Sequence, residues 1–122
     1  MTTRQSLGRW GESLAAEFLQ AQGYVIIGRN VRTPYGEIDL VAESAAPPTL
    51  VFVEVKTRRS EKFGLPEDAV NARKQDHLRS SVDYYLQQHP EFLGATRVDV
   101  IAIQRYHPGE PPVITHFENA FS

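Results

Sequence analysis

Residues 50–56 read LVFVEVK, an apolar, β-branched run that is typical of a buried strand and yet carries two charges. Side chains alternate across a strand, so Glu54 and Lys56 lie on the same face. Burying an ionised carboxylate is costly unless a partner compensates it. Such a pair on a strand is most often solvated, but both faces of this run are apolar, which argues against a solvated face. The two charges therefore indicate a functional site.

A second carboxylate, Asp39, lies in the preceding apolar run, GEIDLVA at residues 36–42. If the two runs pair as neighbouring strands, Asp39, Glu54 and Lys56 converge. Hard cations such as Mg²⁺ take oxygen ligands, usually one or two carboxylates with waters, and the main-chain carbonyl of Val55 is a third candidate oxygen. A metal there would acidify a water, and Lys56 would orient that water or stabilise the transition-state charge. The pattern predicts a Mg²⁺- or Mn²⁺-dependent site for phosphodiester hydrolysis.

A third acid, Glu12, lies at the edge of the apolar stripe of a helix predicted over residues 6–22. From there its carboxylate could reach a metal directly or through a water, although a single acid in this position is more often a surface residue. Gly8 and Gly11 each weaken the same helix by about 1 kcal/mol relative to alanine. Their presence predicts a close approach of the helix backbone to a neighbouring element or a ligand.

The remaining pattern alternates helices and strands in the order helix, three strands, helix, two strands. No internal repeat or linker interrupts it, so we expect one α/β domain over residues 1–122. The predicted elements are a helix at 6–22 that Gly23 ends, strands at 24–32, 36–42 and 49–57, a loop at 44–48, an exposed segment at 58–65, a helix opening at Pro66 and running to about residue 88, and strands at 97–104 and 113–117.

Composition excludes several classes of protein. The absence of cysteine removes disulfides, thiolate zinc sites and cysteine nucleophiles. The N-terminus has no apolar core of signal-peptide length, and no segment approaches the ~20 apolar residues of a membrane span, so we expect a cytoplasmic protein that does not bind membranes. A net charge of −2 argues against nucleic-acid binding by bulk electrostatics alone.

Basic residues nevertheless cluster beside the predicted site. Arg58, Arg59 and Lys62 would hold a phosphate backbone, which gives affinity without sequence readout. Lys74 on the second helix could also touch a phosphate. The alternative for these residues is a solvated charged surface.

Other polar residues are interpreted as structural. Arg97 and Asp99 share one face of a predicted strand and indicate an ion pair. The four histidines show no metal-ligand spacing and are predicted at the surface or partly buried. No glycine-rich phosphate loop precedes a helix, and no Gly-x-Ser-x-Gly motif is present.

Five stretches together form a specific pattern: G-x-x-G-E at 8–12, GEIDL at 36–40, FVEVKTR at 52–58, FG at 63–64 followed by Pro66, and R-x-D-V at 97–100. This pattern resembles the PD-(D/E)xK nuclease superfamily, whose restriction-endonuclease-like fold carries Asp, Asp/Glu and Lys on a central sheet. More closely, nearly the whole chain resembles the YraN-like proteins, an endonuclease-like family related to archaeal Holliday junction resolvases.

The resemblance implies a mixed β-sheet flanked by helices. It also implies that Asp39 and Glu54 bind the metal, that Lys56 is catalytic and that Glu12 is a helix-borne acid of the site. One departure is that Ile38, rather than proline, precedes Asp39.

We therefore expect a metal-dependent endonuclease that selects DNA by structure rather than by sequence, with branched or damaged DNA in repair or recombination as candidate substrates. The chemistry of the fold would leave a 5′-phosphate and a 3′-hydroxyl. Action on two strands would favour a homodimer. The alternative hypothesis is a non-catalytic nucleic-acid-binding or scaffold protein that retains the fold.

Overall fold

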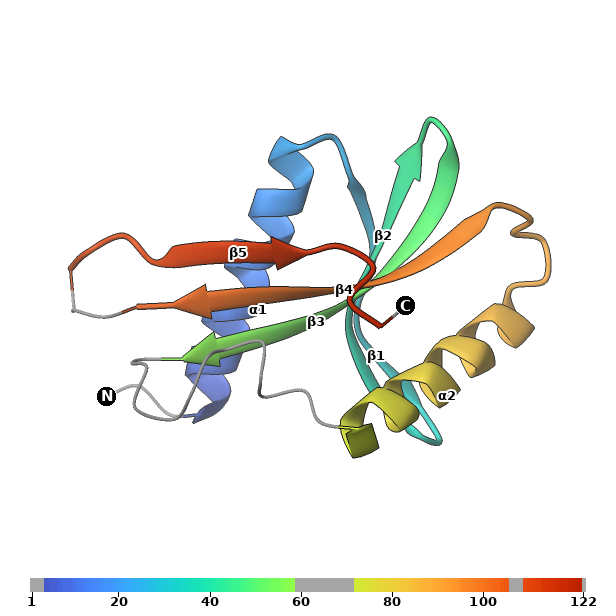
Figure 1. The fold of residues 1–122 in the computed structure, drawn as a ribbon, viewed down its shortest axis with the longest axis horizontal. Helices are drawn as coiled ribbons and strands as arrows, with labels where there is room; N and C mark the ends of the chain where they lie inside the picture. The colour runs from blue at the N-terminus through green and yellow to red at the C-terminus, as the bar shows by residue number, and fades with distance from the viewer. Residues whose placement is uncertain (1–3, 59–71, 106–108, 122) are drawn as a thin grey trace.

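The computed structural model describes residues 4–58, 72–105 and 109–121. The order of its elements is the predicted one, helix, three strands, helix and two strands (Figure 1). The elements are α1 (Arg4–Ala21), β1 (Val25–Thr33), β2 (Gly36–Ala45), β3 (Pro48–Arg58), α2 (Ala72–Gln88), β4 (Ala95–Gln104) and β5 (Val113–Phe117).

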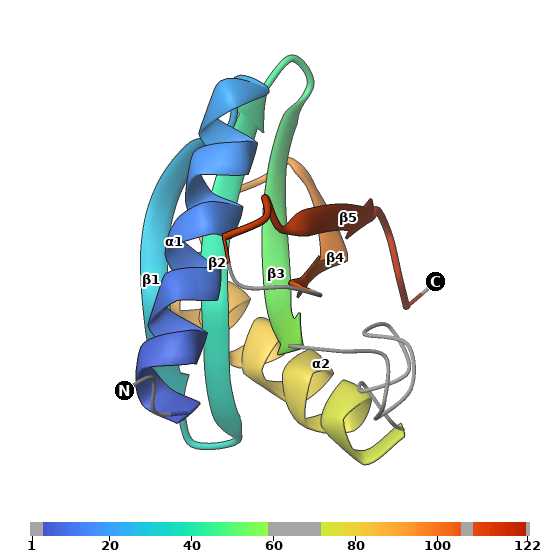
Figure 2. The same ribbon diagram turned by 90° about the vertical axis from the view of Figure 1, so that its left-hand side faces the viewer.

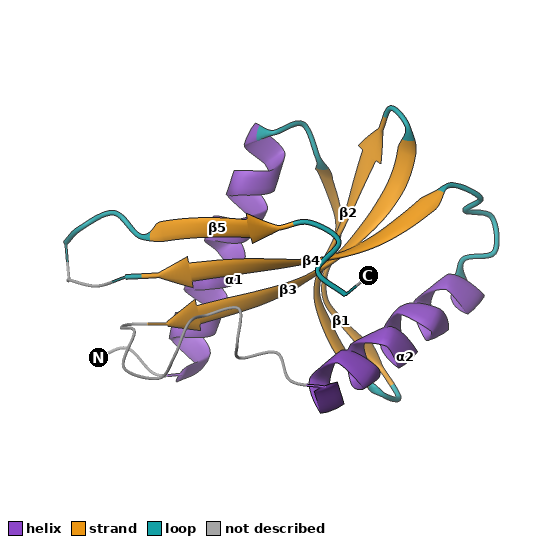
Figure 3. Ribbon diagram, in the orientation of Figure 1, coloured by secondary structure: helices purple, strands orange, loops and turns teal. Residues whose placement is uncertain are grey.

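The five strands form one mixed sheet in the order β1-β2-β3-β4-β5 (Figure 3). All neighbouring strands are antiparallel except β3 and β4, which run parallel. Parallel strands need a crossover connection, and α2 lies in the chain between these two. The predicted mixed α/β fold is therefore confirmed.

Two apolar cores, one on each face of the sheet, account for the continuous apolar run in β3. Val51 and Val53 belong to the core beneath α1, whereas Leu50 and Phe52 belong to the core beneath α2. Figure 2 shows α1 lying along one face of the sheet while α2 lies beyond the other. The strand is thus buried on both faces from Thr49 to Val53, and the residues after Val53 become partly accessible.

The connection between β2 and β3 is shorter than predicted. Residues 44–48 were expected to form a loop, but β2 extends to Ala45 and β3 begins at Pro48. Ser44 pairs with Thr49 across the hairpin, and the hydroxyl of each donates a hydrogen bond to the Pro47 carbonyl. Proline is tolerated as the first residue of a strand, so the proline pair did not prevent strand pairing.

The described C-terminal ends of the two helices agree with the sequence, whereas α1 begins at Arg4, two residues before the predicted start at Ser6. α1 stops at Ala21, and Gly23 follows with a φ of +95°, the left-handed conformation that favours glycine after a helix. The predicted opening of the second helix at Pro66 lies outside the described residues. Neither described helix is long and apolar enough to cross a membrane.

One of the two helix glycines marks the predicted close approach. A Cβ atom on Gly11 would overlap the Thr57 hydroxyl, so this glycine lets α1 lie directly against the end of β3. A Cβ atom on Gly8 would meet no atom of the described residues within 4 Å. The predicted close approach is confirmed for Gly11, which faces the end of β3, whereas for Gly8 it stays a prediction.

The predicted ion pair between Arg97 and Asp99 is part of a larger buried network. Both carboxylate oxygens of Asp99 accept hydrogen bonds of 2.9 Å from Arg97, and His116 and the Asn119 N–H also contact them, at 2.7 and 2.9 Å. Burial acts to raise the pKa of Asp99, but the bonds from His116 and Arg97 outweigh it and lower the pKa. The network fastens β5 and the C-terminal segment to β4.

Candidate functional site

The predicted carboxylates meet where β2 and β3 separate. Pairing between the strands stops at Leu40 and Val53. One residue beyond, Asp39 contacts β3 through its side chain, because its Oδ2 accepts a hydrogen bond of 2.8 Å from the Val55 N–H. This bond fixes the Asp39 carboxyl beside Glu54.

Glu54 and Lys56 project from β3 on the α2 side of the sheet, because they continue the alternation that buries Phe52 there. Their charged ends form an ion pair of 2.9 Å, and the side chains of Lys56 and Glu54 are 13% and 17% exposed. Partial burial makes the attraction stronger than that of a solvated pair. The same-face pair predicted from the two-residue spacing is present.

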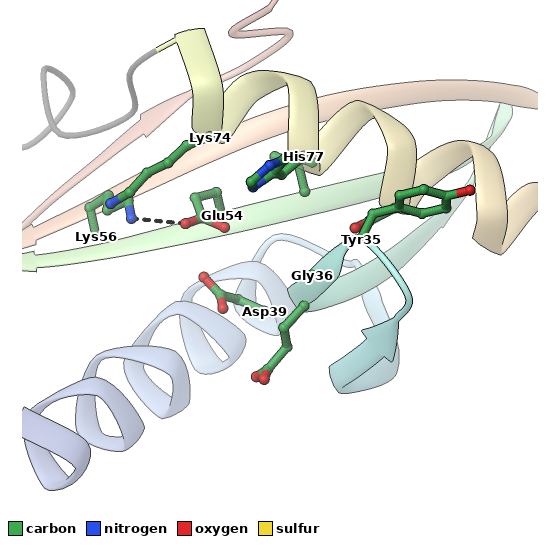
Figure 4. Close-up of a pocket in the computed structure, with 10 residues that line it drawn as sticks. Tyr35, Gly36, Asp39, Glu54, Lys56, Lys74 and His77 are labelled. Atoms are coloured by element: carbon green, nitrogen blue, oxygen red, sulfur yellow. Dashed lines mark ion pairs between the residues drawn. The ribbon is translucent and has the colours of Figure 1, made fainter.

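These residues line a cleft of about 420 Å³ between the sheet and α2 (Figure 4). The floor carries the acids, and α2 contributes the opposite wall. The lining residues are Tyr35, Gly36, Glu37, Asp39, Glu54, Lys56, Lys74, His77, Leu78 and Ser81. Asp39, Glu54, Lys56 and Lys74, which were singled out from the sequence, therefore share one cleft.

Glu54 lies close enough to Asp39 for its charge to oppose the ionisation of the Asp39 carboxyl. Burial raises the pKa of Asp39 from 3.8 to about 8, the charge of Glu54 adds to the rise, and a hydrogen bond between the two side chains acts in the same direction. The bond from the Val55 N–H acts against the rise without cancelling it. In the metal-free chain, burial and the neighbouring charge therefore favour the protonated form of Asp39.

Glu12 approaches the same acids from α1. It is half-buried, and its side chain is hydrogen-bonded to that of Asn30 on β1. Burial raises the pKa of Glu12, the charges of Glu37 and Glu54 raise it further, and the Asn30 bond opposes them. Glu12 also contributes to the raised pKa of Asp39. The helix-borne acid thus belongs to the electrostatic environment of the cleft.

The donor set fits a hydrated hard cation. Within the described parts of the chain, no three His, Asp or Glu side chains gather closely enough to hold a metal ion by themselves. Asp39 and Glu54 supply two adjacent carboxylates instead. Mg²⁺ commonly uses one or two carboxylates and keeps several waters, whereas structural zinc sites are closed by four protein ligands. Asp39 and Glu54 could therefore hold a hydrated cation of this kind.

Lys56 and Lys74 form the basic part of the cleft. Lys74 comes from the first turn of α2, and Figure 4 shows its amine beside that of Lys56. The charge of Lys56 lowers the pKa of Lys74, which is the sign of two cations held close together. Arg58 is half-buried at the end of β3, while Arg59 and Lys62 lie outside the described residues.

Tyr35 and His77 are among the lining residues that the predicted site did not include. Tyr35 lies in the turn between β1 and β2, immediately before the GEIDL motif. His77 follows Lys74 by three residues on α2, a spacing that places both on one helix face. That spacing could have identified His77, whereas no sequence signal showed that the turn bends toward α2.

Comparisons with known proteins agree on one family. A family model described as "Uncharacterised protein family UPF0102" matches residues 11–103. Proteins named "UPF0102 protein" are similar over most of both chains. The one from Syntrophotalea carbinolica is 45% identical over 97% of this chain and 93% of its own, and that from Syntrophomonas wolfei is 46% identical over 96% and 98%. The one from Mycobacterium tuberculosis is 41% identical over 95% and 92%.

Proposed function

The chain belongs to UPF0102, the YraN-like family, and we propose that it is a metal-dependent DNA endonuclease. The observation that carries the proposal is the set formed by Asp39, Glu54 and Lys56 at the point where two strands separate. Hydrolysis of a phosphodiester needs positive charge at the phosphate and a water that loses a proton. This set provides for both requirements in an open cleft.

Asp39 and Glu54 would hold the cation, with the Val55 carbonyl and Glu12 as the further oxygen donors expected from the sequence. When bound, a divalent cation supplies the charge that the phosphate needs and acidifies a water. The raised pKa of Asp39 supports this assignment, because a bound cation would relieve the effect of burial and of the neighbouring Glu54 charge on that carboxyl.

Lys56 would act on the phosphate or on the attacking water. Its ion pair with Glu54 fixes the ammonium inside the cleft instead of leaving it in solvent. An ammonium held in a partly buried site stabilises developing negative charge without having to reorganise. Lys74, which reaches the same place from α2, would bind a neighbouring phosphate.

The basic residues that follow Lys56 would extend the contact along the phosphate backbone. Arg58, Arg59 and Lys62 are the candidates, and contacts of this type select DNA by shape rather than by sequence. Two copies related by a two-fold axis would allow both strands of a branched DNA to be cut.

Cleavage of a labelled panel tests the proposal. We would incubate single-stranded DNA, duplex, flap and four-way junction with the full chain in Mg²⁺, Mn²⁺ or EDTA. Glu54→Ala should lose metal-dependent cleavage. Asp76→Asn is a matched control, because Asp76 is an exposed acid of α2 that does not line the cleft.

We expect cleavage that needs the metal and Glu54 but not Asp76, with products ending in a 5′-phosphate and a 3′-hydroxyl. Binding of the panel without cleavage in either metal would contradict the enzyme and support the non-catalytic scaffold. Cleavage that persists in Glu54→Ala would contradict the assignment of the site.

A further inference from the structure

Tyr35 is an exposed aromatic residue at the edge of the candidate site. Its side chain is 53% exposed, yet it lines the same cleft as Asp39 and Glu54. In the view of Figure 4, the two lysines lie at one end of the row of lining residues and Tyr35 at the other, with Glu54 between them. The cleft therefore has charges suited to a phosphate at one end and an aromatic ring at the other.

The turn that carries Tyr35 is fixed to α2. The Thr33 hydroxyl donates to the Gly36 carbonyl at 2.9 Å and accepts the Tyr35 N–H at 3.1 Å. It also lies 2.8 Å from the hydroxyl of Ser81, which is buried on α2. One donor and two acceptors exhaust the hydrogen-bonding capacity of a hydroxyl. The backbone of this turn is thereby held in one position before any ligand arrives.

An exposed aromatic ring on a turn whose backbone is fixed can stack on a nucleobase. Stacking tolerates any base, because every base has a π-face. Bases inside a duplex are already covered above and below by their neighbours, so an aromatic ring can stack on a base without disrupting the duplex only where that base is unpaired or has been flipped out. A phosphate bound at the carboxylates and lysines would leave a base of the same strand free to meet Tyr35.

We propose that Tyr35 stacks on an unpaired base beside the phosphate in the cleft and so makes the protein prefer single-stranded or branched DNA to intact duplex. The proposal rests on the proposed function, because that function places DNA in the cleft. It adds the structural class of the DNA and the residue that selects it.

Binding measured in EDTA tests the inference without relying on catalysis. We would titrate a fluorescein-labelled single-stranded oligonucleotide and the matching duplex with wild type, Tyr35→Ala and Tyr35→Phe. Tyr35→Ala should weaken single-strand binding about tenfold, with a much smaller effect on the duplex. Tyr35→Phe keeps the ring and should bind as wild type does.

Leu93→Ala is the control, because Leu93 is 92% exposed and does not line the cleft. It should change neither affinity. Equal losses on single strand and duplex in Tyr35→Ala, or no loss on either, would overturn the role of Tyr35, and so would a wild type that prefers duplex.

The inference and the proposed function can fail separately. Absence of metal-dependent cleavage, together with single-strand binding that depends on Tyr35, would reject the endonuclease and retain the stacking residue. Metal-dependent cleavage in which Tyr35→Ala keeps the wild-type ratio of single-strand to duplex cutting would retain the endonuclease and reject the stacking residue.

Discussion

Asp39→Asn should make the metal-free protein more stable at alkaline pH, even though it removes a residue of the proposed centre. The substituting amide can still accept the hydrogen bond from the Val55 N–H through its oxygen. It cannot ionise beside Glu54, so the variant avoids the cost of placing two negative charges together. The substitution thus separates the structural role of Asp39 from its electrostatic cost.

The size and sign of the effect follow from the pKa of Asp39, which is about 8 in the folded chain and 3.8 ordinarily. A raised pKa contributes stability that is fully present below about pH 4 and is lost as the pH rises through about 8. A difference of one in pKa corresponds to about 1.4 kcal/mol, so the loss is at most about 6 kcal/mol. Because water reaches part of the carboxyl, we expect a smaller effect. Between about pH 4 and 8, the free energy of unfolding of the variant should rise by about 2–4 kcal/mol relative to that of wild type.

Urea unfolding in EDTA at about pH 5, 7 and 9 measures the difference between the two proteins. Glu17→Gln is the matched control, because Glu17 is an exposed acid of α1 that does not line the cleft. The difference in unfolding free energy between Asp39→Asn and wild type should grow with pH, whereas the difference between the control variant and wild type should not change with pH. Adding Mg²⁺ at pH 9 should stabilise wild type but not Asp39→Asn. A difference that does not vary with pH would refute the electrostatic account of the cleft.

Four further substitutions test other parts of the structure. Gly11→Ala should lower the free energy of unfolding by about 1–3 kcal/mol, because the added methyl overlaps β3. Gly8→Ala should raise it by up to about 1 kcal/mol, because alanine favours a helix more than glycine does. Urea titrations measure both changes. His116→Ala should cost about 1–3 kcal/mol in the same assay, because buried Asp99 loses a partner. Lys56→Ala should reduce single-turnover cleavage at least about 100-fold while Mn²⁺ affinity, measured by calorimetry, changes little.

The central part of the site could be predicted because it depends on short-range periodicity. Alternation along β3 places Glu54 and Lys56 on one face whatever the rest of the fold does. The prediction that Asp39 joins them needed one further assumption, that β2 and β3 are neighbours. Strands joined by a short connection commonly are neighbours. The observed pairing fulfils that assumption.

Features that depend on tertiary contacts could not be read from the sequence. Gly8 and Gly11 give the same signal, and only the packing of α1 on β3 distinguishes them. The place of Tyr35 depends on the bond between Thr33 and Ser81, which are 48 residues apart. A turn signal identifies a change of chain direction but not the surface against which the turn packs.

The addition of His116 to the Arg97–Asp99 pair has the same cause. The predicted pair needed only the spacing of two residues on one strand. His116 joins it because the β4–β5 register pairs His116 with Ile101, two residues after Asp99 on β4. That register is set by the sheet as a whole and not by the sequence around the histidine.

The measurement that tests the central claim most directly is the metal-dependent release of a labelled strand from a flapped duplex by wild type and Asp39→Asn. Reactions run side by side in Mn²⁺ and in EDTA, and circular dichroism verifies that both proteins are folded. The account predicts cleavage by wild type in Mn²⁺ only and none by the variant. Equal cleavage by both proteins, or none by a folded wild type, would contradict it.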